Sequence, residues 1–194
     1  MNTNQRTRKK GREVSSAGAR SLTKLEEFAR PYYAEKDAMH DLSHIRRFLR
    51  VARTLSKRYH ADDQVLTCAA YFHGIDQGKH RGDLCKFLES QGLRGRRAEK
   101  VLRVALESQK ESRPKTIEGK VLHDAHLLEG GRTFMVAKSL VTGILRGSSL
   151  REIADYFEDN IDGKFECYLP EARKAYAEKE RFAREFFHSL KRSL

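Results

Sequence analysis

Two histidines and one aspartate stand in apolar stretches of this sequence, near the ends of predicted helices. They are His44, His73 and Asp124. A polar side chain in apolar surroundings costs free energy unless a partner satisfies it. Two imidazoles and a carboxylate from separate segments can hold a divalent metal ion and leave positions open for water and substrate. Because such an ion lowers the pKa of bound water and neutralises phosphoryl charge, we predict that these three residues are metal ligands and catalytic residues.

Three predicted helices position these side chains. A helix that begins after the N-cap residue Asp41 carries His44 at the edge of an apolar stripe. The segment 68–76, with the sequence CAAYFHGID, has the pattern of the last turns of a buried helix, which would present its histidine to a cleft. A third helix over residues 114–128 carries Asp124 as the one acidic residue inside its apolar block.

Composition favours a single all-α domain. The chain has 194 residues with only 3 prolines and 13 glycines, and it has few strand-like runs of Val, Ile and Thr. We expect a disordered basic tail over residues 1–21 and one helical domain of about eight or nine helices over residues 22–194. Pro31 should kink or end the first helix, and residues 77–83 should form a short charged loop.

The net charge is +12 and the sequence pI is about 9.8. This charge suits a polyanionic partner, so the basic tail could contact nucleic acid, although an ordinary solvated surface explains it equally well. No apolar run approaches the roughly 18 residues that span a membrane, and the N-terminus lacks the apolar region of a secretory signal. The three cysteines have no paired spacing. We therefore expect a cytoplasmic protein with reduced cysteines and no membrane partner.

The polar clusters together resemble the HD-domain superfamily of metal-dependent phosphohydrolases, above all its small stand-alone bacterial hydrolases. The motifs that carry the resemblance are HDLSHIRR at 40–47, AAYFHGI at 69–75 and VLHDAHLLE at 121–129. In that family, a first histidine, a His-Asp doublet and a distal aspartate bind the catalytic metal. The resemblance implies the HD helical bundle over residues 22–194, a divalent ion such as Mn, Mg, Zn, Fe or Ni, and ligands at His44, His73 and Asp124.

Two departures from the family pattern concern the metal. Gly74 replaces the aspartate of the His-Asp doublet, and the distal motif, commonly Asp-Ala-Asp, here ends in His126. On a continued helix Asp76 would share the face of His73, and we predict that it fills the vacant ligand position. His80 and His126 are the alternatives. The metal could also have been lost.

Four residues are candidates for contacting a substrate phosphate, because cations near an open metal site suit phosphoryl anions. They are Arg47, Lys79, His80 and Arg81. The function that the resemblance implies is that of an HD-type phosphohydrolase acting on a nucleotide or another small phosphoester through a metal-activated water. The alternative is a degenerate HD domain that binds a nucleotide or nucleic acid as a regulatory protein.

Overall fold

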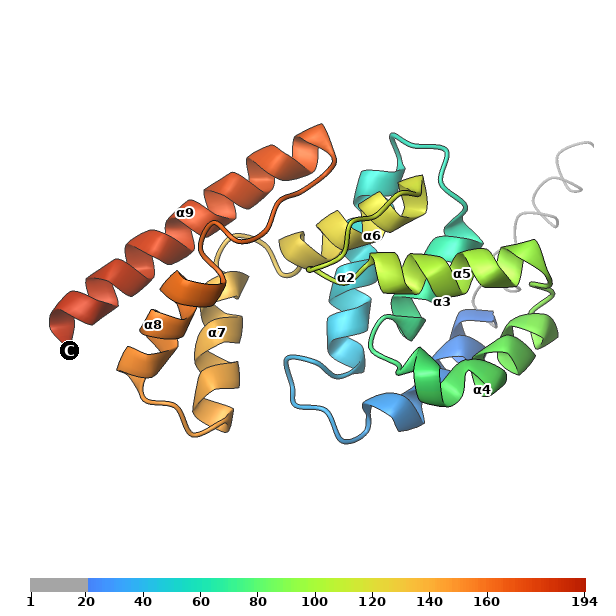
Figure 1. The fold of residues 1–194 in the computed structure, drawn as a ribbon, viewed down its shortest axis with the longest axis horizontal. Helices are drawn as coiled ribbons and strands as arrows, with labels where there is room; N and C mark the ends of the chain where they lie inside the picture. Colours follow the sequence, from blue (N-terminus) through green and yellow to red (C-terminus); the bar gives the residue numbers. More distant parts are fainter. Residues whose placement is uncertain (1–20) are drawn as a thin grey trace, which may run out of the picture.

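The computed structural model describes residues 21–194, and in this range the chain forms helices and loops without a β-strand (Figure 1). Residues 21–29 are helical and run into a short 3₁₀ helix, η1 (Arg30–Tyr33). The α-helices that follow are α2 (Leu42–Ser56), α3 (Asp63–Phe72), α4 (Gln77–Ser90), α5 (Arg96–Glu107), α6 (Ile117–Leu128), α7 (Phe134–Leu145), α8 (Leu150–Asn160) and α9 (Pro170–Ser193). The predicted all-α fold class is confirmed for these residues. The predicted basic tail lies, except for its last residue, outside them.

The larger of two hydrophobic cores lies among α2, α3, α5 and α6. In this core α2 packs on α3 and α6, and α5 packs on α3 and α6. Its largest side chains include Phe48, Tyr71, Phe72 and Leu122, each at most 2% exposed. The apolar stripe that the sequence predicts on α2 is the face buried here. The core therefore fixes the positions of the helices that carry the candidate ligands.

A second, smaller core joins α7, α8 and the C-terminal half of α9, which form a separate group beside the main bundle (Figure 1). Its centre is the stacked pair Phe157 and Phe187, whose ring centroids are 4.6 Å apart. The N-terminal part of α9 packs instead on α6 and the main core, through residues such as Ala172 and Tyr176. Helix α9 thus connects the two groups.

Most helix ends follow local sequence rules. Asp41, Asp62 and Thr116 each accept a hydrogen bond from a backbone N–H in the first turn of the helix that they precede. Ser149 and Glu152 form a capping box at the start of α8. As predicted, the first helix ends near Pro31: it gives way to the 3₁₀ helix at Arg30.

The prediction of a charged loop over residues 77–83 is wrong. The Asp76 side chain accepts a hydrogen bond from Gly78 N at 2.9 Å and starts α4 at this point, and the buried Leu84 and Leu88 hold the helix against the core. The chain leaves α3 at His73 and re-enters a helix only at Gln77. His73 and Asp76 therefore do not share one continued helix.

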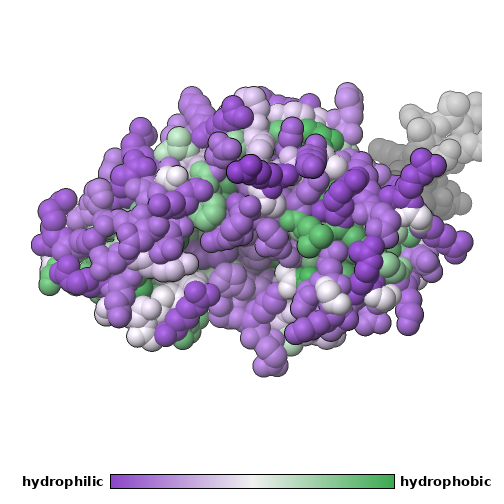
Figure 2. All heavy atoms as spheres, viewed as in Figure 1, coloured by the Kyte–Doolittle hydropathy of each residue, from purple (hydrophilic) through white to green (hydrophobic). Residues whose placement is uncertain are grey.

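The visible face of the molecule is mostly hydrophilic, with small hydrophobic areas between hydrophilic side chains (Figure 2). Within residues 21–194, no helix combines the length and apolar character that crossing a bilayer requires.

Lys179 of α9 is a buried cation that caps another helix. Its Nζ donates to the carbonyl oxygens of Leu127 at 2.9 Å and Glu129 at 2.6 Å, at the C-terminal end of α6. A cation suits this end of a helix because the last carbonyl groups lack intrahelical partners. Burial nevertheless lowers the pKa of Lys179 to about 8. The charged form therefore reduces stability at neutral pH relative to a solvated lysine.

We expect this lysine to make stability rise with pH. Its pKa is about 8 in the folded chain against an ordinary value of 10.5. Between these values the unfolded chain binds more protons, so deprotonation favours folding. We therefore compare the free energy of unfolding of the wild type with that of Lys179→Met. The wild-type value should rise, relative to that of the variant, by about 3 kcal/mol at most between the two pKa values. Urea unfolding of both proteins across the interval measures this difference, in which the titration of tyrosine and cysteine cancels. Parallel profiles would contradict the prediction.

Candidate metal centre

Three histidines from three helices meet on one side of the main core. They are His44 in α2, His73 at the C-terminal end of α3, and His126 in α6. One ring nitrogen from each lies within 4.8 Å of the other two. The Phe48 ring packs against all three, with centroid separations of 5.2–5.9 Å. The imidazoles therefore have little freedom to move apart.

Ser108, at the C-cap of α5, orients two of these imidazoles. Its hydroxyl donates to the Ala105 carbonyl at 2.6 Å, so its oxygen accepts from His73 Nδ1 at 2.7 Å. The Ser108 carbonyl accepts from His126 Nδ1 at 3.3 Å. Both rings thus carry a proton on Nδ1 and keep the lone pair on Nε2. Metal-ligating histidines in proteins commonly have such a partner on the nitrogen that does not bind the metal.

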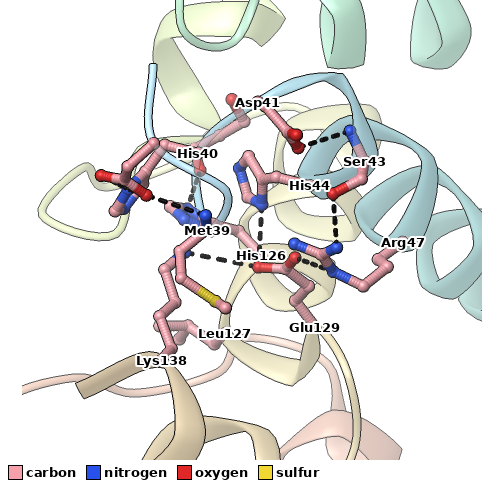
Figure 3. Close-up of polar contacts among 12 residues, drawn as sticks. Met39, His40, Asp41, Ser43, His44, Arg47, His126, Leu127, Glu129 and Lys138 are labelled. Atoms are coloured by element: carbon pink, nitrogen blue, oxygen red, sulfur yellow. Dashed lines mark hydrogen bonds and ion pairs between the residues drawn. The ribbon is translucent and has the colours of Figure 1, made fainter. Parts of the chain in front are cut away.

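Glu129 contacts the His44 imidazole on its Nδ1 side. Its Oε2 lies 2.8 Å from His44 Nδ1, and its Oε1 accepts from Arg47 Nε at 2.7 Å. Lys138 Nζ of α7 lies 3.4 Å from the same carboxylate, and Figure 3 shows these three side chains converging on it. Burial raises the pKa of this carboxyl group, but His44, Lys138 and Arg47 outweigh that effect and lower it to about 2. Glu129 is therefore an ionised partner, not a proton donor.

The three histidines are neutral at pH 7. Burial lowers the pKa of His73 to about 3, with a further contribution from the neighbouring His44 and lysines. Burial also lowers the pKa of His44 and moves that of His126 well below its usual value. Neutral imidazoles with free Nε2 lone pairs are the form that binds metals. The donor set therefore fits a metal ion.

Asp124, the third predicted ligand, is not brought to the two histidines by the structure. Its carboxylate accepts from Tyr168 N at 2.9 Å and Leu169 N at 2.7 Å, and it also contacts His123 Nδ1 at 3.1 Å. It thereby anchors the backbone at the start of α9. His126 joins the centre instead, because residues two apart on a helix are separated by about 200°. The ligand prediction for Asp124 thus has no geometric support.

Gly74 makes room for a lysine. Lys36 Nζ donates to the Gly74 carbonyl at 2.6 Å, and Tyr33 Oη accepts from Gly74 N at 3.0 Å. A Cβ atom at position 74 would lie 2.5 Å from Lys36 Nζ. An ammonium group therefore stands beside the position where the family resemblance implies a carboxylate.

Asp76, the predicted replacement ligand, is the half-exposed N-cap of α4 and pairs with Lys79. Lys79 itself is 78% exposed. The His80 ring packs edge-on against Tyr32 in the same region, at a centroid distance of 4.9 Å, and Arg81 binds Glu99 with both contacts at 2.7–2.8 Å. None of these groups belongs to the histidine cluster among the described residues.

Two hollows adjoin the centre. A cleft of about 490 Å³ is lined by the three histidines together with Lys36, Gly74, Asp76 and Lys110, among other residues. A cavity of about 440 Å³ lies between α6 and the group of α7, α8 and α9, and its lining includes Phe134, Phe165, Lys138 and Arg146. His40, Lys110 and His126 line both. Of the predicted substrate-binding residues, Lys79, His80 and Arg81 line neither, and Arg47 is held by Glu129 and Ser43.

Several residues of the site were not predicted from the sequence. Ser108 and Lys36 carry no local signal, because a serine after a helix and a lysine in a turn are ordinary. Glu129 does have one, since it ends the apolar motif VLHDAHLLE, in which a carboxylate needs a partner.

No family model matches the sequence, and no curated protein does. Solved structures do match. The Lin1889 protein of Listeria innocua is 18% identical, with 89% of this chain and 94% of that chain covered and a TM-score of 0.70. An HD-superfamily hydrolase of Bacillus thuringiensis is 19% identical, with coverages of 92% and 97% and a TM-score of 0.69. Bacillus subtilis YpgQ in complex with ADP is 19% identical, with coverages of 88% and 97% and a TM-score of 0.67.

Substitution of Asp124 should affect stability more than metal binding. Asp124→Ala leaves two backbone N–H groups and His123 without their acceptor, so we expect the metal-free protein to lose roughly 2–4 kcal/mol of unfolding free energy, and Asp124→Asn to lose less. Urea unfolding measures this loss, with the exposed Asp63→Asn as control. Elemental analysis of the folded Asn variant should find the wild-type metal content. An Asn variant with wild-type stability and no metal would instead make Asp124 a ligand.

Proposed function

From the HD-superfamily fold of this chain, we propose that it is a metal-dependent phosphohydrolase whose metal is held by His44, His73 and His126. The observation that carries this proposal is the convergence of three neutral imidazoles, each with a polar partner beside its Nδ1, next to an open cleft. A bound divalent ion supplies a water of lowered pKa and a Lewis acid for a phosphoryl oxygen. A domain that only served as a scaffold would not need three imidazoles, two of them buried, oriented in this way.

The remaining residues of the two hollows suit a phosphorylated small molecule. Lys36 and Lys110 line the cleft beside the histidines and can pair with phosphate oxygens. The adjoining cavity offers aromatic and apolar side chains together with Lys138 and Arg146. Its volume lies in the range of roughly 300–1,000 Å³ that is usual for ligand pockets. YpgQ, which shares the fold, has been crystallised with ADP. These features favour a nucleotide or another phosphoester with an apolar part as the substrate.

The hydrolase proposal predicts phosphate release that requires both a divalent ion and His73. Untagged protein is incubated with a generic aryl phosphate and with a panel of nucleotides, each in the presence of several divalent ions. We expect His73→Ala to lower kcat/KM by at least about 100-fold, because one ligand is lost. The exposed His60→Ala serves as the control and should retain wild-type activity. No turnover of any substrate with any ion would reject the hydrolase and leave a binding protein.

Lys36 should contribute to substrate binding. Removing one charge-assisted hydrogen bond costs about 1.5–3 kcal/mol, so we expect Lys36→Met to raise KM by roughly 10- to 100-fold with a smaller change in kcat. Lys79→Met is the matched control, because this lysine lies outside both hollows. A raised KM in the Lys79 variant alone would place the substrate on α4 instead.

A further inference from the structure

The candidate metal centre offers nitrogen donors only. Within the described residues, the group of side chains close enough to share an ion consists of three histidines. The nearby carboxylates are committed elsewhere. Glu129 contacts His44, Arg47 and Lys138, and Asp124 binds the backbone before α9. Asp76, which lines the cleft, caps α4 and pairs with Lys79. The protein donors therefore carry no negative charge.

The residue at position 74 also contributes to the absence of negative charge among the donors. A carboxylate beside His73 would supply an anionic oxygen, but Gly74 has no side chain and Lys36 Nζ occupies the adjacent space. Lys36 thereby places a positive charge beside the position of the missing carboxylate. The same charge opposes the binding of ions that rely on electrostatic attraction to anionic ligands.

Divalent ions differ in the donors that they prefer. Mg²⁺ and Ca²⁺ take oxygen ligands, and carboxylate, carbonyl and water also suit Mn²⁺. Imidazole suits Zn²⁺, Cu²⁺, Fe²⁺ and Ni²⁺, and a catalytic zinc site can consist of three histidines with an open fourth position. We propose that this centre selects a nitrogen-preferring transition-metal ion of the Zn²⁺ class over Mg²⁺ and Mn²⁺. The inference rests on the proposed function, in which His44, His73 and His126 are the ligands.

The selectivity has a consequence for the ligand that completes the site. Because all three protein donors are neutral, the bound ion keeps its double positive charge, and Lys36 and Lys110 add positive charge at the mouth of the cleft. An anionic oxygen from a small ligand is therefore favoured there. A phosphoryl group provides such an oxygen, which connects the choice of ion to the choice of substrate.

Metal affinities of the untagged, metal-free full-length chain test the proposal. Competition with a chromophoric chelator gives the Kd for Zn²⁺, calorimetry gives the Kd for Mn²⁺ and Mg²⁺, and the visible spectrum of the Co²⁺ form reports the coordination number. We expect one Zn²⁺ per chain, bound at least about 1,000-fold more tightly than Mn²⁺. His126→Asp exchanges one nitrogen donor for an oxygen. It should lower the ratio of the Mn²⁺ Kd to the Zn²⁺ Kd by at least about 10-fold. The exposed His60→Ala should leave it unchanged.

The wild-type measurement can by itself overturn the proposal, so the test stands even where a variant fails to fold. An affinity for Mn²⁺ or Mg²⁺ within about 10-fold of that for Zn²⁺ would overturn the proposed metal selectivity. If Mn²⁺ or Mg²⁺ then supported hydrolysis, the proposed hydrolase function would still stand. Zn²⁺ binding that is unchanged in a folded His126→Ala variant would also overturn the proposed selectivity, because the ion would then lie elsewhere. Selective Zn²⁺ binding without hydrolysis of any phosphoester would support the inference and reject the proposed function.

Discussion

The structure around the candidate site depends on one buried carboxylate. Glu129 is 1% exposed, and an isolated charge at that depth would cost several kcal/mol. Arg47 from α2 and Lys138 from α7 balance it, and the His44 imidazole takes the remaining contact. These contacts join the end of α6 to α2 on one side and to α7 on the other. The carboxylate thereby sets the tautomer of a candidate ligand and holds together the elements that border both hollows.

The other two imidazoles depend on a single residue of a different helix. Ser108 uses its side-chain oxygen for His73 and its backbone carbonyl for His126. The end of α5 thus fixes the relative orientation of two rings whose centroids are 4.4 Å apart. Neither Ser108 nor Glu129 belongs to the histidine group itself. The centre is consequently shaped as much by its outer partners as by the imidazoles.

The fold class and two of the three converging histidines could be predicted from the sequence, and His126 was named as an alternative for the vacant ligand position. The spacing of apolar residues identifies the helices, and His44 and His73 stand out as polar residues within their buried faces. The choice between Asp124 and His126 was beyond such reasoning, because α6 is buried over most of its length and polar residues occur on more than one side of it. Asp76 was expected on a continued helix, and the break between α3 and α4 removes that premise. Contacts such as Ser108 with His73 join distant segments and leave no local pattern.

Helix α9 contributes no side chain to the histidine cluster, yet it and the residues just before it form hydrogen bonds with α6 and its C-cap on both sides of His126. Asp124 binds the backbone that leads into α9, and Lys179 from the middle of α9 binds the carbonyls of Leu127 and Glu129. α9 thus stabilises the position of the C-terminal part of α6, which carries His126. Breaking either contact would let that ring shift relative to the other two. The geometry of the centre therefore depends in part on the C-terminal helix, which contributes no donor to it.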